Sequence, residues 1–273
     1  MIFFSDLDGS FLATDKSIGA VNRAALDEIE RLGMQFVPCS GRALGGIDPW
    51  LLSHPAVRYA IAANGATVTE LESSETVYRA DLGHERARRL FELARGRDVT
   101  FDIFADGKCF ERRSTLVRLG DFVPDAAFLK GMLATRTPFD GDTLEFMDTL
   151  EHIERIAFYW HDPADRDFLD RASRRLAGVS VVRSFETNVE VSDECATKGS
   201  ALSWLCDHLG IPTADAVAFG DNVNDVSMLE AAGTGVAMSN AVPEAKRSAD
   251  AVCATNDEEG VGRFILELLD RAR

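Results

Sequence analysis

Short apolar runs alternate with amphipathic segments near both ends of this chain, and this alternation limits the folds available to it. Near the start, residues 2–5, 34–40 and 56–66 read as strands, and residues 17–33 have helical spacing that stops at Gly33. The last part of the chain has helix-like segments at 197–211, 225–233, 241–249 and 260–273, and strand-like segments at 216–222, 234–238 and 250–255. Strands that alternate with helices predict a parallel sheet with right-handed crossovers, that is, an α/β, Rossmann-like doubly wound core.

The middle of the chain has a different pattern. Residues 99–112 predict a hairpin around Asp106 and Gly107, residues 154–162 and 179–192 read as strands, and residues 83–95 and 165–176 read as helices. We therefore expect an α+β insert at residues 79–187, between two core segments at 1–78 and 188–273.

Charge and cysteine content exclude several classes of protein. The formal net charge of −16 argues against nucleic acid or an anionic membrane as a partner, and a phosphate site would need local positive charge. The five cysteines are widely spaced and form no C-x-x-C pair, which is typical of free thiols in a reducing compartment. With no apolar run of membrane-spanning length and no signal-peptide pattern, we expect a cytoplasmic protein, a monomer or a small homo-oligomer.

Polar residues follow several of the predicted core strands. They are Asp6 and Asp8 after residues 2–5, Ser40 and Arg42 after the second strand, Asn64 after the third, and Asp221 near the end of 216–222. The carboxyl ends of parallel strands meet at one edge of a sheet, where ligands bind. These side chains are therefore expected to converge on one cleft.

Asp6 and Asp8 stand two residues apart, so in a continuing strand they would point the same way. Their repulsion would be relieved by a cation or by protonation of one carboxyl. Asp6 and Asp221 together suit Mg²⁺, which prefers hard oxygen ligands, and Asp8 could act as acid and base. Alternatively, Asp6 and Asp8 could simply cap a turn after the strand and have no catalytic role.

The segment GDNVNDVSML places Asp221 between a strand and a helix, with Asn224 and Asp225 in the first helical turn. Asp225 also fits a purely structural role as a helix cap. Ser40, Gly41 and Arg42 could bind an anion or form an ordinary turn. Lys198 begins a predicted helix, where a cation is unfavourable unless it binds a phosphate or nearby carboxylates. The alternative interpretation is an exposed lysine in a loop.

Four segments in this order, DLDGS, CSGR, TKG and GDNVND, resemble the haloacid dehalogenase superfamily, and the insert resembles the large α+β cap of its Cof-like phosphatase branch. The NGA segment at Asn64 is similar to that branch too. Ser10 stands where the family usually has threonine, and it keeps the hydroxyl.

The resemblance implies a Mg²⁺-dependent phosphohydrolase that acts on small phosphomonoesters, namely sugar phosphates or related metabolites. Asp6 would be the nucleophile that forms an aspartyl-phosphate, and Asp8 would protonate the leaving alcohol and later activate water. Mg²⁺ would be held by Asp6, the Asp8 carbonyl and Asp221. The remaining implied roles are phosphate binding by Ser40 and Lys198, substrate contacts by Gly41, Arg42, Asn64 and Asn224, and support of the metal or Lys198 by Asp225.

Two other functions remain open from the sequence. A phosphomutase would pass through the same aspartyl-phosphate, and a phosphate-binding protein would keep the fold without turnover. The presence of Asp6, Asp8, Ser40, Lys198 and Asp221 together favours the enzyme. Within the insert, Arg112, Arg113, His161 and Arg183 are expected to be structural or solvated rather than ligands.

Overall fold

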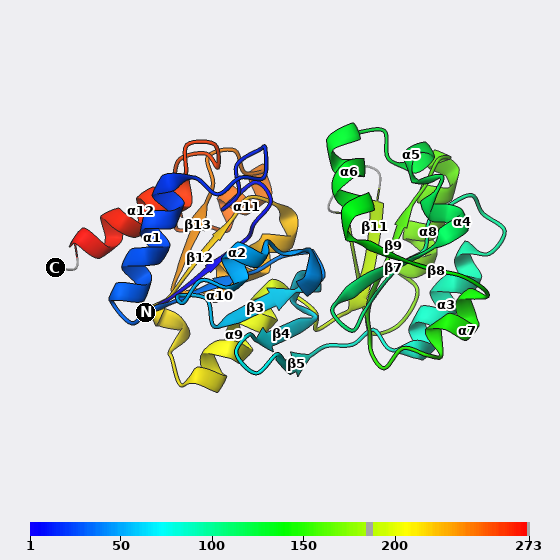
Figure 1. Cartoon of the computed structure of the whole chain (residues 1–273), viewed down its shortest axis with the longest axis horizontal. Helices are drawn as coiled ribbons and strands as arrows, with labels where there is room; N and C mark the ends of the chain where they lie inside the picture. Colours follow the sequence, from blue (N-terminus) through cyan, green and yellow to red (C-terminus); the bar gives the residue numbers. More distant parts are fainter. Residues whose placement is uncertain (184–187, 272–273) are drawn as a thin grey trace. The chain divides into compact units, whose positions relative to one another are not determined.

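The computed structural model describes residues 1–183 and 188–271. The chain divides into two compact units (Figure 1). The first contains Met1–Gly41, Ile47–Tyr78 and Thr197–Arg273, and the second contains Arg42–Gly46 and Arg79–Ala196. Among the helices in the described part of the chain, none has both the length and the apolar character of a membrane span.

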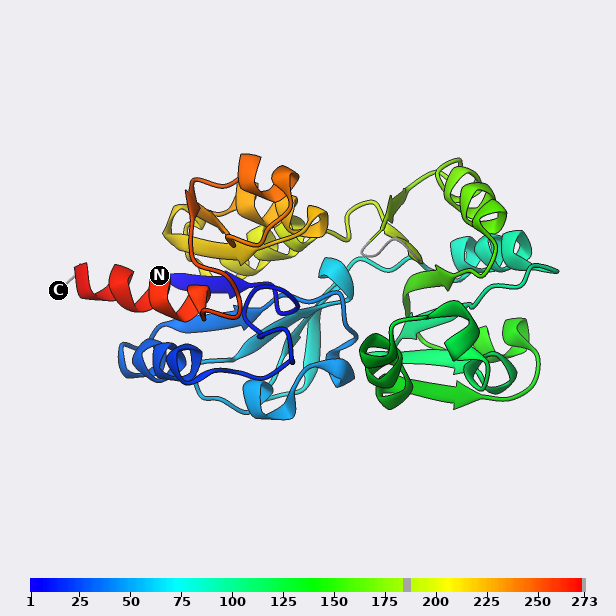
Figure 2. The same ribbon diagram turned by 90° about the horizontal axis from the view of Figure 1, so that it is seen from above.

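The first unit is built on a five-stranded parallel sheet in the order β14-β13-β12-β1-β2. All four residues of β1 are buried, as expected for a central strand with both faces covered. Figure 2 shows α1 and α9 on opposite sides of β1, so the sheet is doubly wound as predicted. The strands are β1 (Ile2–Ser5), β2 (Gln35–Pro38), β12 (Ala216–Gly220), β13 (Thr234–Ala237) and β14 (Ala251–Val252).

Helices connect these strands, and their ends follow recognisable signals. The Glu259 carboxylate accepts hydrogen bonds from the Val21 and Asn22 amides at the start of α1 (2.7 and 3.0 Å). Gly33, with φ of +65°, follows the end of this helix, as a C-terminal glycine does. The helices of this unit are α1 (Ala20–Arg31), α2 (Pro49–Leu52), α9 (Lys198–Leu209), α10 (Val226–Ala231), α11 (Pro243–Arg247) and α12 (Gly260–Arg271), with short 3₁₀ turns at Ala63–Gly65, Thr213–Asp215 and Val223–Asp225.

The third predicted core strand lies parallel to β2 but pairs more extensively outside the core sheet. β3 (Tyr59–Ala62) heads a separate three-stranded sheet with β4 (Thr67–Glu70) and β5 (Glu75–Arg79), and it runs antiparallel to β4. A parallel bridge, Cys39 to Ile61, links it to the end of β2, and the Ser40 amide donates to the Ile61 carbonyl (2.9 Å). The left-handed turn at Asn64 and Gly65 reverses the chain at once, so β3 also pairs with the next segment, β4.

The second unit contains a six-stranded sheet in the order β10-β11-β9-β6-β7-β8. The hairpin predicted at Asp106 and Gly107 forms between β6 and β7. The pairings are antiparallel except that of β7 with β8, which is parallel. The strands are β6 (Asp102–Ala105), β7 (Lys108–Arg112), β8 (Arg136–Phe139), β9 (Ile153–Tyr159), β10 (Val179–Val182) and β11 (Asn188–Asp193).

Helices cover both faces of this sheet through two separate apolar clusters. Leu90 of α3 and Leu169 of α8 pack on one face, and Leu119 and Met132 of α5 and α6 pack on the other. Figure 1 shows α6 and α3 on opposite sides of the sheet. The helices are α3 (His84–Ala94), α4 (Arg113–Leu116), α5 (Leu119–Phe122), α6 (Ala126–Thr135), α7 (Thr143–Met147) and α8 (Pro163–Ser173), and a 3₁₀ turn lies at Leu44–Gly46.

The expected boundary at residue 188 was wrong. β11 pairs with β9 and β10 through residues 188–193, so it belongs to the second unit, and the chain returns to the first unit at Thr197. The apolar pattern of this segment gave no sign of which sheet it joins. Residues 184–187 of the predicted strand and 272–273 of the last predicted helix lie outside the described residues.

A buried carboxyl pair lies on the α5–α6 face of the second unit. Asp102 accepts two hydrogen bonds from the Arg136 guanidinium (2.6 and 3.0 Å), and Glu111 accepts the amides of Phe101 and Arg112. Burial, with the nearby Asp102 charge, raises the pKa of Glu111 well above its ordinary value. Glu111 therefore keeps its proton to a higher pH in the folded chain than in the unfolded chain.

Glu111→Gln should flatten the pH dependence of stability. Because the pKa of Glu111 is raised on folding, its favourable contribution is complete at acidic pH and declines as pH rises. The wild-type thermal midpoint should therefore fall more steeply than that of Glu111→Gln between about pH 5 and pH 8. Identical slopes in the two proteins would contradict a protonated Glu111.

Candidate functional site

Two adjacent parallel strands bring Asp6 and Asp221 to the same edge of the core sheet. Ser5 of β1 pairs with Phe219 of β12, and the Asp6 amide donates to the Phe219 carbonyl (2.9 Å). Asp6 follows β1 directly, and Asp221 follows β12 directly. The prediction that these two carboxylates converge is confirmed by the cluster that they form with Asp225, whose ligand atoms lie within 4.8 Å of one another.

Lys198 is fully buried between two carboxylates of this cluster. Its ammonium nitrogen lies 2.5 Å from Oδ1 of Asp6 and 2.6 Å from Oδ1 of Asp225. Lys198 is the first residue of α9, and Thr197 caps the helix by accepting the Ser200 amide. The two carboxylates explain a cation at a helix N-terminus, where it is otherwise unfavourable. Lys198 is therefore not the exposed loop lysine of the alternative interpretation.

Asp225 organises the loop that carries Asp221. Its Oδ2 accepts the backbone amides of Asp221 and Asn222 (2.9 Å each), while its Oδ1 accepts Lys198. Asn222 and Asp225 form a reciprocal capping box at the 3₁₀ turn. The capping and site interpretations of Asp225 are thus compatible, because different oxygens serve the two purposes.

The loop after Asp6 is shaped to the Asp221 carboxylate. The Ser10 hydroxyl donates to Oδ1 of Asp221 (2.9 Å). Gly9 has φ of +92°, and a Cβ there would lie 2.6 Å from Oδ2 of Asp221. Glycine at position 9 is required both by its backbone conformation and by this close approach. The sequence analysis did not predict this contact of Ser10 with Asp221; the only signal was the position of Ser10 directly after Gly9.

Negative charge exceeds positive charge in this cluster. Burial, and the neighbouring carboxylates of Asp225 and Asp221, raise the pKa of Asp6 well above its ordinary value, although Lys198 opposes the shift. Burial and Asp225 raise the pKa of Asp221 to about 6. The two carboxylates also raise the pKa of Lys198, which stays charged despite its burial.

The donor set fits a hard divalent cation. Three carboxylates surround one ammonium, and burial together with repulsion between the carboxylates raises the pKa values of Asp6 and Asp221. A bound cation would offset both effects. Both oxygens of Asp225 already accept hydrogen bonds. Asp6 and Asp221 are therefore the side chains that could hold the cation, and carboxylate oxygens suit magnesium or calcium.

Asp8 does not join this cluster. β1 ends at Ser5, so the strand alternation that predicted parallel side chains for Asp6 and Asp8 does not apply. The Asp8 carboxylate instead pairs with the ammonium of Lys16 (2.7 Å). Sequence reasoning missed Lys16, whose only signal was a lysine close to the two aspartates.

Ser40, Gly41, Asn64 and Asn224 meet in the first unit. The Asn64 amide donates to the Ser40 carbonyl (3.0 Å), and Asn224 Nδ2 donates to Oδ1 of Asn64 (3.0 Å). Asn64 is buried with φ of +60°, a conformation that asparagine tolerates better than most residues. A Cβ at Gly41 would lie 2.9 Å from Oδ1 of Asn64. The predicted proximity of these segments is confirmed, while their contacts with substrate stay predictions.

The remaining candidates lie in the second unit. Arg42 donates to the Gly46 carbonyl (3.0 Å), and its expected contact with phosphate stays a prediction. Arg113 pairs with Asp140 (3.1 Å) and Arg183 with Asp170 (3.6 Å). These ion pairs agree with the structural interpretation of the insert's basic residues.

A second group of possible metal ligands is a poorer candidate. Asp27, Glu30 and His54 have ligand atoms within 4.8 Å of one another. The Ala56 amide donates to Nδ1 of His54 (3.2 Å), so a neutral ring carries its proton on Nε2, the nitrogen that faces Asp27. That nitrogen then donates a hydrogen bond rather than binding a cation.

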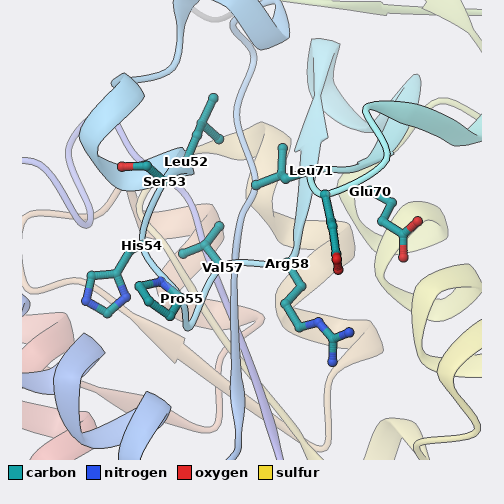
Figure 3. A pocket seen from close by; sticks show the side chains of 9 residues that line it. Leu52, Ser53, His54, Pro55, Val57, Arg58, Glu70 and Leu71 are labelled. Carbon is teal, nitrogen blue, oxygen red and sulfur yellow. The ribbon is translucent and has the colours of Figure 1, made fainter.

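His54 also lines a pocket of about 220 Å³ that is separate from the carboxylate cluster. Figure 3 shows His54, Val57 and Arg58, from the segment between α2 and β3, around this pocket with Glu70 and Leu71 at the end of β4. Glu70 already accepts the hydroxyls of Tyr59 (3.1 Å) and Ser73 (2.7 Å). Asp6, Asp221 and Asp225 do not line this pocket, so we do not place the active site there.

Lys198→Met should destabilise the first unit by about 3 kcal/mol, because Asp6 and Asp225 would lose their buried counter-charge. Adding Asp225→Asn should restore part of that loss. Denaturant unfolding in a chelator measures both effects, with Lys130→Met as a control at an exposed lysine. Equal stability of Lys198→Met and wild type would contradict a buried ion-pair network.

Known proteins resemble this chain along nearly its whole length. It is 28% identical to "Phosphatase YwpJ" of Bacillus subtilis, with 97% of this chain and 98% of that protein covered. It is 26% identical to "Pyridoxal phosphate phosphatase YbhA" of Escherichia coli, with 95% of each covered. A solved haloacid dehalogenase-like hydrolase from Bacteroides thetaiotaomicron matches with a TM-score of 0.83, 26% identity and 98% coverage of both chains.

The family model for haloacid dehalogenase-like hydrolases matches residues 3–265, which include both units. The resemblance inferred from the four sequence motifs is therefore confirmed. This chain belongs to the haloacid dehalogenase-like hydrolases, in their Cof-like branch.

Proposed function

We propose that this protein is a Mg²⁺-dependent phosphatase that hydrolyses small phosphomonoesters through an aspartyl-phosphate on Asp6. The observation that carries the proposal is the position of Asp6, which stands at the edge of the core sheet with its carboxylate fixed by buried Lys198 and beside Asp221. A nucleophilic carboxylate needs such a fixed orientation and nearby positive charge for the phosphoryl group. The similar proteins named as phosphatases support the same reaction class.

In the first step, a carboxylate oxygen of Asp6 attacks phosphorus, and the bond between phosphorus and the substrate's alcohol oxygen breaks. Asp8 gives its proton to the departing alcohol. In the second step, Asp8 takes a proton from water as the water oxygen attacks the phosphoryl group. The bond from phosphorus to Asp6 then breaks, which releases inorganic phosphate and regenerates both carboxyl groups.

The other side chains have supporting roles. Lys198 orients Asp6 and balances charge that develops on the phosphoryl oxygens, and Ser40 is the further phosphate contact that we propose. Mg²⁺, held by Asp6, Asp221 and the Asp8 carbonyl, would supply Lewis-acid stabilisation of the phosphoryl oxygens. Asp225 fixes both Lys198 and the loop of Asp221.

We further propose that the second unit is a cap that selects the substrate, with Gly41, Arg42, Asn64 and Asn224 as substrate contacts. Sugar phosphates and related metabolites are the proposed class, and pyridoxal phosphate is a test compound because a similar protein is named for it. The five cysteines are free thiols, which supports a cytoplasmic location.

Phosphate release from a panel of sugar phosphates, nucleotides, pyridoxal phosphate and p-nitrophenyl phosphate tests this function. Activity should require Mg²⁺, stop in EDTA and return when excess Mg²⁺ is added. Asp6→Asn should abolish it, a loss of at least about 10⁴-fold, while keeping the thermal midpoint near the wild-type value. An isomerised product without phosphate would favour a mutase. Full activity of Asp6→Asn would remove Asp6 as the nucleophile.

A further inference from the structure

Two loops carry the side chains that could hold the cation, and these loops touch directly. Asp6 begins the loop after β1, and Asp221 begins the loop after β12. The buried Ser10 hydroxyl donates to Oδ1 of Asp221 (2.9 Å). At Gly9 the backbone comes so close to Asp221 that a Cβ would overlap its carboxylate. The separation of the two loops is therefore tightly constrained on this side.

A third segment, the turn that follows β13, lies at the same edge of the sheet. β13 runs parallel to β12 (Figure 1), and its last residue pairs with the residue before Asp221. The chain then turns through residues 238–241, where the Ala241 amide donates to the Met238 carbonyl (2.9 Å). Asn240 is the third residue of this turn.

Asn240 binds the loop after β1 through its side chain. Its Nδ2 donates to the Gly9 carbonyl (2.8 Å), and its Oδ1 accepts the Asn256 amide (3.1 Å). The second bond fixes the orientation of the side-chain amide, because a backbone N–H can bond only to the oxygen. The nitrogen of Asn240 therefore faces the Gly9 carbonyl.

The same turn also binds the loop of Asp221. The Val242 amide, two residues after Asn240, donates to the Asp221 carbonyl (2.8 Å). Together with the Ser10 contact, these bonds close a ring. The bracing ring consists of Gly9, Asn240, Val242, Asp221 and Ser10. A closed ring of hydrogen bonds restricts the separation of the two loops more than a single bond would.

We propose that Asn240 is a positioning residue for the divalent cation. By binding the Gly9 carbonyl, it keeps the loops of Asp6 and Asp221 at the separation that a shared cation needs. This inference rests on the proposed function, because it takes Asp6 and Asp221 as the side chains that hold Mg²⁺. Groups that orient metal ligands without contacting the metal change metal affinity by roughly 10- to 100-fold. Because Asn240 is exposed, we expect the lower end of that range.

Mg²⁺ binding to the metal-free protein tests this role without turnover. Asn240→Ala should raise the Mg²⁺ dissociation constant, measured by isothermal titration calorimetry, about 10-fold. Its thermal midpoint in EDTA should fall by about 4 °C at most, because the side chain that is lost is exposed.

Ser248→Ala is the matched control. Ser248 is another neutral polar residue of the first unit, and its hydroxyl donates to Glu230 (2.9 Å). Neither Ser248 nor Glu230 belongs to the bracing ring. The Mg²⁺ dissociation constant of Ser248→Ala should equal that of the wild type.

Phosphate release at varied Mg²⁺ concentration separates positioning of the metal from a direct role in the reaction. Asn240→Ala should need about 10-fold more Mg²⁺ for half-maximal rate. Its kcat at saturating Mg²⁺ should be within about 2-fold of the wild-type value, because excess metal favours the conformation that binds it.

Two results would overturn the proposal. One is an unchanged Mg²⁺ dissociation constant in Asn240→Ala, and the other is a loss of kcat that saturating Mg²⁺ does not restore. Asp221→Asn distinguishes this failure from failure of the proposed function. If Asp221→Asn weakens Mg²⁺ binding and Asn240→Ala does not, the inference alone fails. If Asp221→Asn binds Mg²⁺ as tightly as the wild type, the proposed metal site itself fails.

Discussion

The burial of the Lys198 ammonium between Asp6 and Asp225 is the interaction on which the geometry of the site depends. A buried charge without partners costs several kcal/mol, so α9, the end of β1 and the loop after β12 must stay together. The backbone permits this only through close approaches at glycine. A Cβ at Gly65 would overlap the Thr197 carbonyl, and one at Gly199 would overlap the Ser227 carbonyl. Three segments far apart in sequence are thus fixed around one ammonium.

The carboxylates at this sheet edge are only partly neutralised by Lys198. Lys198 pairs with Asp225 and orients Asp6, yet burial and neighbouring carboxylates keep the pKa values of Asp6 and Asp221 raised. That excess of negative charge would attract a divalent cation. With a bound divalent cation, Lys198 would then supply the local positive charge that a phosphate ester needs in a chain of net charge −16.

Much of the fold followed from periodicity, because strands buried on both faces and amphipathic helices have distinct patterns. The parallel core, the hairpin at Asp106 and the convergence of Asp6 with Asp221 were all predicted. The pairing partners of two strands were not predicted. β3 fits a parallel core strand, but the turn at Asn64 also pairs it with β4. β11 has the pattern of a core strand, although it joins the sheet of the second unit. The direction of Asp8 was predicted wrongly because β1 ends at Ser5, three residues before it, and its ion pair with Lys16 does not follow from strand alternation.

The most direct test of the central claim is to find where the phosphoryl group is held during turnover. The enzyme would be mixed with p-nitrophenyl phosphate and Mg²⁺, quenched in acid within the first turnovers, digested and examined by mass spectrometry. The account predicts a phosphorylated peptide that contains Asp6 in the wild type and none in Asp6→Asn. A phosphoryl group on another residue, or steady turnover with no phosphorylated peptide at any quench time, would contradict it.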